Sequence, residues 1–412
     1  MLIVAAPKID LLGAAWERRA PPQREEFARG NIAVEIVRGP LFAIYDYQWA
    51  TFFGGSLVVG LLAIPLFQLF GSSLLVLKMV PALFQAAAAA CAFGLLDRVA
   101  SRRAAWIGGL LLALGMPGYS AIGTIAWGVH LELNTFVLAA MWLYATIVDA
   151  QGPATKRWLA LGLLGGFATW FGYGFTITIA TIGVVELVRN RRFLVSRAFP
   201  VLLAGFVVGF LPWIVYNVAN DFSGLEIYGA GAGEHFSGSA TSSIGSRVVL
   251  LLTELLPESM GFRDDWFGNG RAVGAVVMVV LLAAAVPGVR ALVRRGAVGA
   301  PLLVFPALYL VAFLGGDFFE TAASWTALPQ LRYLCPLHPP LLLVAGIGFD
   351  RLARRVPLGR LALGVAAALL ALIAAGNAAL VDRSNTGSPR AHPRALRLRA
   401  RRLARRAFRH RP

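Results

Sequence analysis

Residues 198–216 read AFPVLLAGFVVGFLPWIVY, a run without a single charged side chain. A run of this length suits a helix that crosses the roughly 30 Å hydrocarbon core of a bilayer. The whole chain has the same character, because 58% of its 412 residues are hydrophobic, only 14% are charged, and the mean hydropathy is +0.69. Such a composition excludes a disordered chain, a collagen, a disulfide scaffold and an ordinary soluble enzyme. The sequence therefore predicts an all-α polytopic membrane protein.

Apolar runs separated by short basic or polar breaks predict ten membrane spans. They are 74–96, 104–122, 133–148, 158–171, 173–188, 198–216, 272–292, 300–315, 336–350 and 358–380. Glycine and proline inside them, such as Pro117, are expected to be tolerated because neighbouring helices can satisfy the freed backbone groups. The stretch 52–70 is a candidate eleventh span, and we favour a helix that lies at or dips into the outer interface. The bundle therefore has ten or eleven transmembrane helices.

Lysine and arginine are distributed unevenly between alternate loops, which predicts the orientation. One set of loops carries sixteen, at 98–103, 156–157, 189–197, 290–295 and 351–360, and the opposite set carries only Arg247, Arg263, Arg271 and Arg332. The first set is therefore expected on the cytoplasmic side. Charged side chains within the ten intervals lie only near their ends, at Lys78, Glu186, Arg290, Asp350 and Arg360. A transport pathway would place paired charges deeper in the membrane, so we expect the chemistry at the outer face.

The chain is expected to divide into five parts. They are a first outer loop with interfacial helices (1–73), a transmembrane core (74–216), a long outer loop (217–271) that holds a Gly/Ser-rich flap, C-terminal spans (272–380) and an Arg-rich tail (382–412). The tail holds eleven arginines, which favour contact with anionic lipids over nucleic acid, because Phe408 is its only aromatic residue. Cys91 and Cys335 predict neither a disulfide nor a zinc site.

Several short motifs lie where the outer ends of these spans are expected. Glu25-Glu26 opens the first outer loop, the run Phe53 to Gly71 ends in a Leu-Phe-Gly signature, and Lys78 follows at the start of the next helix. Further motifs on this side are His130-Leu131-Glu132, Leu211-Pro212-Trp213, and Arg332-Tyr333-Leu334 with Pro336 and Pro339, while Asp97-Arg98 with Arg103 forms a basic turn on the expected cytoplasmic side.

Together these motifs resemble the GT-C glycosyltransferases, in the branch of the protein O-mannosyltransferases and the lipid A aminoarabinose transferase. The resemblance covers most of the chain. It implies transfer of a sugar from a polyprenyl-phosphate donor to a glycan, lipid or protein acceptor at the outer face, with inversion of the anomeric centre. The chain differs from the family in three respects: it has Glu-Glu where the family has Asp-Glu, lacks the first transmembrane helix expected before that pair, and has a short C-terminal region.

The resemblance implies a set of site residues. Glu25 or Glu26 would be the general base, while Lys78 and Arg332, with Tyr333, would bind the leaving phosphate. His130 and Glu132 would position the sugar. We expect no cofactor, and one histidine with one carboxylate gives little support for a divalent metal.

Each of these residues also has a structural interpretation. The acidic pair, flanked by Arg24 and Arg29, could be a solvated helix start. The His130–Glu132 pair could cap the helix that begins at Leu133, and Lys78 could extend to lipid headgroups. Glu234-His235 and Asp264-Asp265 lie in the long outer loop. The second pair, with Trp266, could contact the acceptor, but we favour a solvated turn.

We therefore predict a glycosyltransferase in the inner membrane of a bacterium, with its active face toward the periplasm. The bacterial origin rests on the Ala-, Gly- and Arg-rich composition. Two alternatives remain at this point: a carrier or lipid flippase without catalysis, and an inactive scaffold subunit of the same fold.

Overall fold

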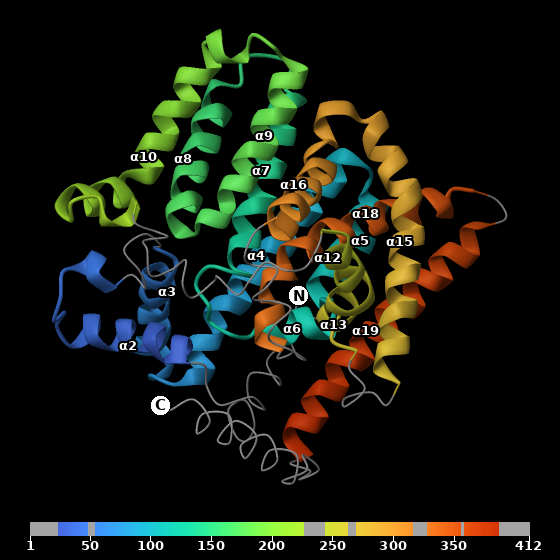
Figure 1. Cartoon of the computed structure of the whole chain (residues 1–412), viewed down its shortest axis with the longest axis horizontal. Helices are drawn as coiled ribbons and strands as arrows, with labels where there is room; N and C mark the ends of the chain where they lie inside the picture. Colours follow the sequence, from blue (N-terminus) through green and yellow to red (C-terminus); the bar gives the residue numbers. More distant parts are fainter. Residues whose placement is uncertain are drawn as a thin grey trace, which may run out of the picture.

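The computed structural model describes residues 24–47, 54–225, 244–262, 269–315, 328–355 and 358–386. In this part of the chain every regular element is a helix (Figure 1). The N-terminal half contains α2 (Arg24–Arg38), α3 (Gly55–Phe70), α4 (Leu74–Val99), α5 (Arg102–Leu114), α6 (Pro117–Ile122), α7 (Leu133–Val148), α8 (Thr155–Phe171), α9 (Thr176–Arg189) and α10 (Ala198–Ala219). The C-terminal half contains α12 (Ile244–Leu250), α13 (Leu256–Ser259), α15 (Gly270–Arg294), α16 (Pro301–Gly315), α18 (His338–Ala353) and α19 (Leu358–Thr386).

Each of the ten predicted spans is mostly helical, and the expected all-α architecture is confirmed. Four helices are long and apolar enough to cross a bilayer: Leu74–Val99, Ala198–Ala219, Ala272–Arg294 and Leu358–Ala379. Shorter apolar helices include α3, α7 and α16. The chain is a multi-pass membrane protein, and the number of crossings remains a prediction.

The interval 104–122 is not one helix, which corrects the sequence prediction. Its first part, α5, ends at Leu114, and α6 begins only at Pro117. Gly115 between them has a φ of +63°, a conformation that favours glycine, and Pro117 supplies the first residue of α6. The freed carbonyls of Leu114 and Gly115 accept hydrogen bonds from the side-chain amide of Asn377 on α19. The chain therefore turns here, just before the loop that carries the candidate site.

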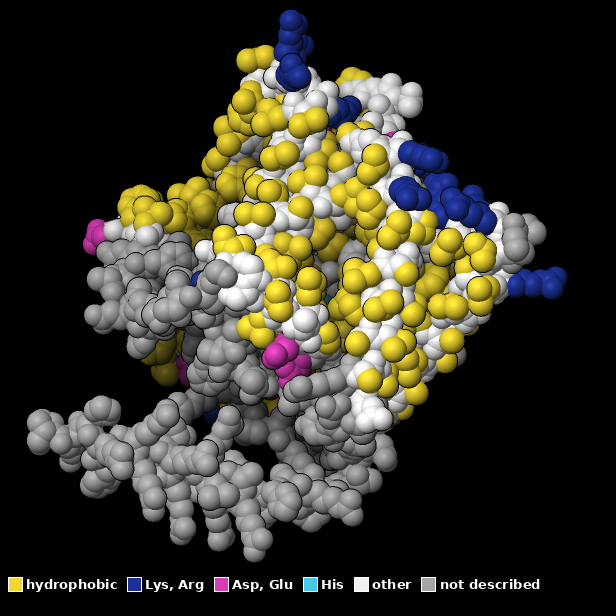
Figure 2. All heavy atoms as spheres, turned by 45° about the vertical axis from the view of Figure 1, so that its right-hand side comes forward, with side chains coloured by type: hydrophobic (Ala, Val, Ile, Leu, Met, Phe, Trp, Pro, Cys, Tyr) yellow, Lys and Arg dark blue, Asp and Glu magenta, His cyan; other side chains and the backbone are white. Residues whose placement is uncertain are grey.

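The surface supports a transbilayer orientation of the bundle. Figure 2 shows hydrophobic side chains across the middle, Lys and Arg at the upper end and acidic side chains lower down. At the basic end the buried Asp350 carboxylate lies 2.6 Å from Arg103 and 2.9 Å from Arg354, and it accepts a 3.0 Å hydrogen bond from Ser101. This cluster connects α18 to the turn between α4 and α5.

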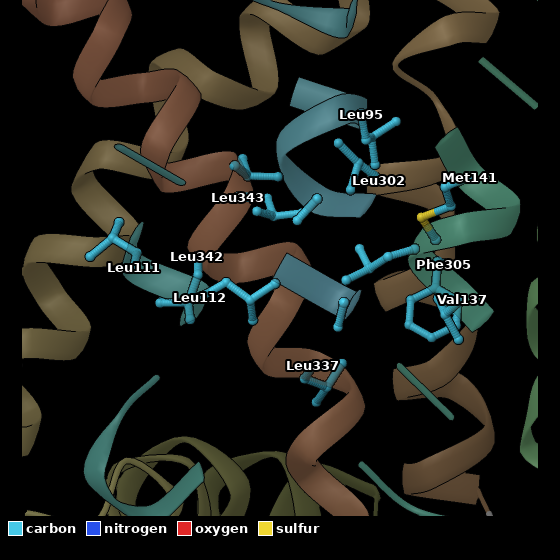
Figure 3. Close-up of a cluster of buried hydrophobic side chains, with 14 of the residues drawn as sticks. Leu95, Leu111, Leu112, Val137, Met141, Leu302, Phe305, Leu337, Leu342 and Leu343 are labelled. Atoms are coloured by element: carbon cyan, nitrogen blue, oxygen red, sulfur yellow. The ribbon is translucent and has the colours of Figure 1, made fainter. Parts of the chain in front are cut away.

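The core lies between α4, α5, α7, α16 and α18. Figure 3 shows Leu95, Leu111, Val137, Leu302 and Leu342 from these five helices in one buried cluster. These side chains are buried because they interdigitate closely with one another. Such close packing fixes the relative positions of the five helices.

The helices α8 and α10 approach each other through glycines. A Cβ atom at Gly162 or Gly166 of α8 would collide with the α10 backbone, and one at Gly205 or Gly209 would collide with the α8 backbone. Each pair is spaced four residues apart, which is the small-residue spacing that allows close contact of membrane helices. The pair α8 and α10 forms the upper left of the bundle in Figure 1.

The helix α3 packs against both α2 and α4. The described part of the stretch 52–70 thus contains a helix, as expected, and the end of α3 is exposed at Leu69 and Phe70. Several sequence predictions lie outside the described residues. These are the N-terminal residues 1–23, the Gly/Ser-rich part of the long loop at 226–243, Asp264-Asp265, and the Arg-rich tail from 387 onward.

Candidate active site

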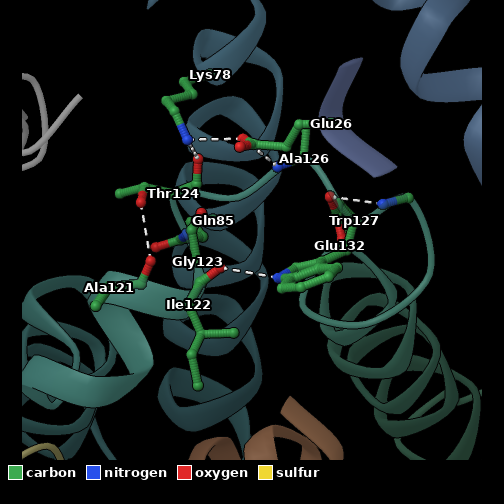
Figure 4. A network of polar contacts seen from close by, with 11 residues as sticks. Glu26, Lys78, Gln85, Ala121, Ile122, Gly123, Thr124, Ala126, Trp127 and Glu132 are labelled. Carbon is green, nitrogen blue, oxygen red and sulfur yellow. Dashed lines mark hydrogen bonds and ion pairs between the residues drawn. The ribbon is translucent and has the colours of Figure 1, made fainter. Parts of the chain in front are cut away.

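A buried ion pair joins the first two helices of the site. Lys78 of α4 donates a hydrogen bond of 2.6 Å to the Glu26 carboxylate of α2, and only 3% of each side chain is exposed. Lys78 also donates to the Thr124 carbonyl at 3.0 Å, and the same Glu26 oxygen accepts a 3.1 Å hydrogen bond from the Ala126 N–H. Figure 4 shows these contacts converging on the loop between α6 and α7. The pair therefore attaches that loop to two helices.

The loop 123–132, which we call the site loop, is fixed from several directions. Arg29 of α2 donates to the Trp127 carbonyl at 2.8 Å, and the Gln85 side-chain amide of α4 donates to the Gly123 carbonyl. At Gly128 the backbone has a φ of +87° and lies directly against Gly55, the first residue of α3. A side chain at either glycine would separate α3 from the loop.

Glu132 ends the site loop, and its carboxylate is only half satisfied. One oxygen accepts a 3.0 Å hydrogen bond from the Gly128 N–H, while the other is buried without a partner among the described residues. Although Glu132 occupies the N-cap position of α7, its side chain makes no capping hydrogen bond there. Burial raises the pKa of Glu132 above its usual range. The hydrogen bond from Gly128 and the charge of Arg29 lower this pKa, but by less than burial raises it.

An aromatic cluster with one cation covers the same loop. The Arg332 guanidinium lies 4.3 Å from the centre of the Trp127 ring and 5.2 Å from that of Tyr333. His130 contacts both rings edge-on, at 5.9 Å from Trp127 and 5.2 Å from Tyr333. The pKa of His130 lies well below its usual value. Burial is the largest cause, and the positive charges of Arg332 and Arg29 add to it. The imidazole is therefore neutral at pH 7.

The structure thus brings together most of the site residues predicted from the sequence. Glu26 and Lys78 contact the site loop from one set of helices, His130 and Glu132 belong to it, and the segment with Arg332 and Tyr333 packs on it. The side chain of Glu25 lies outside the described part of the chain.

Two structural interpretations from the sequence are wrong. Glu26 and Arg29 do not form a solvated helix start, because they are 2% and 1% exposed. Lys78 does not extend to lipid headgroups, because it is paired inside the protein.

Two further residues of the site, Arg29 and Trp127, are not predicted from the sequence. Arg29 was treated as a flanking charge, although its spacing of three residues from Glu26 places both on neighbouring positions of one helix. Trp127 has no signal in the sequence, because its role depends on the position of Arg332, which is more than 200 residues away along the chain.

Comparisons with known proteins give a consistent structural result. No protein-family model matches the chain, and no curated protein matches it in sequence. Solved structures do match. ArnT from Cupriavidus metallidurans bound to undecaprenyl phosphate has a TM-score of 0.56 and 15% identity, over 94% of this chain and 75% of that one. AglB from Archaeoglobus fulgidus, an oligosaccharyltransferase in complex with an inhibitory peptide and a dolichol-phosphate, has a TM-score of 0.56 and 15% identity over 93% of this chain.

The chain has the GT-C fold. The archaeal oligosaccharyltransferase in complex with zinc and sulfate also has this fold, with a TM-score of 0.56 and 15% identity over 92% of the chain. The chain spans about half of the oligosaccharyltransferase, 52% of its length. At these identities the comparison establishes the GT-C fold of this chain, as the sequence motifs predicted.

Proposed function

We propose that this protein transfers a sugar from a polyprenyl-phosphate donor to an acceptor at the outer face of a membrane. The proposed location is the inner membrane of a bacterium, with the site toward the periplasm. The GT-C fold supports the reaction class, and the neighbours crystallised with undecaprenyl phosphate and with dolichol-phosphate support the donor class. The observation that carries the proposal is the buried Glu132 oxygen without a partner among the described residues, in a loop held beside two cations.

The cations would bind the phosphate of the donor. As the sugar leaves, negative charge develops on the polyprenyl phosphate, and a cation placed beforehand stabilises it. Arg332 suits this role because a guanidinium matches the geometry of phosphate oxygens, and its stacking on Trp127 restricts its orientation. Lys78 is the second candidate, held in place by Glu26 and the Thr124 carbonyl.

A carboxylate would accept the proton of the acceptor hydroxyl. The hydroxyl oxygen forms a bond to the anomeric carbon, the bond from that carbon to the phosphate oxygen breaks, and the hydroxyl proton passes to the base. The sequence predicts Glu25 or Glu26 as this base. The contacts favour Glu132, because Glu26 is occupied by the Lys78 ammonium, whereas Glu132 has an oxygen without such a partner and a raised pKa suited to proton transfer.

A divalent metal does not fit this arrangement. Among the described residues, no three side chains of His, Cys, Asp or Glu come close enough to hold one. The charges of Arg29 and Arg332 act on His130, next to the only unsatisfied carboxylate oxygen of the loop. The positive charge of these two arginines repels a metal cation at that position. The proposed reaction therefore proceeds without a metal.

The test uses the release of polyprenyl phosphate, which is a product whatever the sugar. Protein in nanodiscs would be incubated with lipid-linked sugars and acceptors extracted from bacterial membranes. We expect E132Q to lose about a hundredfold or more in rate, a typical effect for removal of a general base, while R332Q weakens the binding of undecaprenyl phosphate.

Two controls separate the site from the rest of the chain. R192Q removes an exposed cation at the basic end, and it should leave the rate of sugar transfer and the binding of undecaprenyl phosphate unchanged. E26Q tests the base predicted from the sequence. If E132Q transferred sugar at the normal rate while E26Q did not, Glu26 would be the base and the assignment to Glu132 would be wrong; release of no polyprenyl phosphate by any form would contradict the transferase itself.

A further inference from the structure

A second polar pocket lies on the outer part of the molecule, beside α2. It has a volume of about 290 Å³ and is bordered by α2, by the short 3₁₀ helix η1 (Ile44–Tyr47) and by the start of α3. Its eight lining residues include Asn31, Glu35, Asp46 and Ser56. At roughly 30 Å³ per water molecule, the space holds a compact group of about ten heavy atoms.

The pocket lies on a different face of α2 from the candidate active site, and its Ser56 adjoins Gly128 of the site loop through the backbone. Its α2 residues are Ala28, Asn31, Ile32 and Glu35, whose spacing of three and four residues places them on one face of the helix. Glu26 and Ala33 lie on the other face, toward α4. Because successive residues of a helix are turned by about 100°, position 26 is on nearly the opposite side from position 28.

The lining carries negative charge that nothing in it balances. Glu35 and Asp46 contribute two carboxylates, and none of the eight lining residues is basic. Neither carboxylate has an ion-pair or hydrogen-bond partner through its side chain in the described part of the protein. Aspartate and glutamate are charged at neutral pH, so the pocket repels phosphates and other anions, including the headgroup of the proposed donor.

A buried hydroxyl gives an independent indication of a ligand. Ser56 lines the pocket and is 1% exposed, yet its hydroxyl has no hydrogen-bond partner among the residues that the structure describes. A buried polar atom left unsatisfied costs about 1–3 kcal/mol, so native proteins usually satisfy such groups with a partner or a bound molecule. Here the hydroxyl borders a space large enough for one.

The donors and acceptors of the pocket specify the chemistry of that ligand. Both carboxylates, the Asn31 side-chain carbonyl and the Ser56 hydroxyl all accept hydrogen bonds. An alkylammonium group supplies three donors and no acceptor. The rings of Phe42 and Tyr47, which meet edge-on at 5.8 Å, belong to the same lining, and aromatic rings attract cations. A divalent cation is disfavoured, because no third His, Cys, Asp or Glu joins the two carboxylates among the described residues.

We propose that this pocket binds the protonated amine of an alkylammonium ligand, with Glu35 and Asp46 balancing its charge and Ser56 accepting one of its hydrogen bonds. The amine belongs either to a soluble molecule or to a lipid headgroup. Binding here does not depend on the proposed sugar transfer, so the two can be tested separately.

The probe is ethanolamine, with 1,2-ethanediol as its uncharged analogue of nearly equal size. Protein in phosphatidylglycerol nanodiscs, which contain no amine, would be studied by saturation-transfer difference NMR. We expect a signal for ethanolamine, at least tenfold weaker binding in E35Q/D46N, and binding weakened several-fold in S56A. The variant D46K should abolish binding, since it places a tethered ammonium in the pocket from an exposed position.

The matched control is D221N, which removes one exposed acidic charge elsewhere on the chain and should bind ethanolamine normally. Unfolding temperatures close to that of the wild type would show that the variants fold. To identify the source of the amine, native mass spectrometry would compare retention of phosphatidylethanolamine with that of phosphatidylglycerol. Selective retention that is lost in D46K identifies a lipid, and binding of ethanolamine alone identifies a soluble amine.

Three results would overturn the proposal. The first is equal binding of 1,2-ethanediol, which would remove the role of charge. The second is unchanged ethanolamine binding in E35Q/D46N, and the third is displacement of ethanolamine by magnesium at constant ionic strength. Failure of both amine sources to bind would have the same meaning.

Discussion

The Lys78 ammonium lies 2.6 Å from the Glu26 carboxylate, although the two residues are 52 positions apart, and both side chains are almost completely buried. Two charges removed from water in this way stabilise each other only while both are present. The pair also holds the site loop through Thr124 and Ala126. It therefore connects the stability of α2 and α4 to the geometry of the candidate active site.

A double-mutant cycle on this pair should reveal strong coupling. We expect E26Q and K78M each to lower the free energy of unfolding by about 3–5 kcal/mol, because each leaves one buried charge unpaired. The combined variant E26Q/K78M should lose less than the sum of the two. Thermal unfolding in detergent measures all four proteins, and simple additivity would mean that the two groups do not interact in solution.

The pH dependence of sugar transfer should report on Glu132. Burial raises the pKa of its carboxyl group, and the proposed base is active only when ionised. The rate should therefore rise with pH, with a midpoint above the ordinary glutamate value of about 4.3. This rising limb should be absent from the residual activity of E132Q. If the rate still rose with pH in E132Q but no longer did so in E26Q, the general base would be Glu26.

The same shift predicts how Glu132 affects stability. Because the folded protein holds the Glu132 proton more tightly than the unfolded chain, deprotonation favours unfolding. The stability of the wild type relative to E132Q should therefore fall as pH rises from about 4.3 through the raised pKa. Unfolding temperatures of both proteins at pH 4 to 8 test this, and a difference that grows in favour of the wild type would contradict the direction of the shift.

The contact between Gly55 and Gly128 should not tolerate a methyl group. In G55A the new Cβ would collide with the Gly128 carbonyl and would lie 2.8 Å from the Phe171 carbonyl oxygen. We expect a loss of about 1–3 kcal/mol in stability, typical of overpacking, and a larger fractional loss of activity. The control G364A adds the same methyl group in open space on α19 and should be neutral.

The orientation in the membrane can be tested by cysteine labelling. Asn220 follows α10 and is predicted outside, whereas Gly152 precedes α8 and is predicted in the cytoplasm; both are exposed. In intact cells an impermeant maleimide should label N220C and not G152C, while both should react after lysis. The parent protein, with Cys335 buried and Cys91 half-buried, provides the background. The reverse pattern would invert the proposed topology.

Much of the fold could be predicted from the sequence, because uninterrupted apolar composition requires a helix wherever water is excluded. The break at Gly115 and Pro117 was not predictable in this way. Both residues are also tolerated inside membrane helices, and the exposed carbonyls accept hydrogen bonds from the nearby Ser120 hydroxyl and also from the side chain of Asn377 on α19. That partner is more than 260 residues away.

The site was predictable only for residues whose charge is unusual in an apolar chain. Lys78, Glu132 and Arg332 stand out for this reason, and all three lie at the site loop. The assignment of roles was harder, because adjacent glutamates are equivalent in a sequence. Only the contacts distinguish the paired Glu26 from the half-satisfied Glu132.

The contacts of the site loop limit how the proposed transferase could change its acceptor. Its ten residues contribute the carbonyl that binds Lys78, the ring under Arg332 and the backbone N–H that orients Glu132. An insertion or deletion within it would displace the proposed phosphate contacts and the proposed proton acceptor at once. New acceptor preferences would therefore have to arise by substitutions in other segments, while the length of this one stays constant.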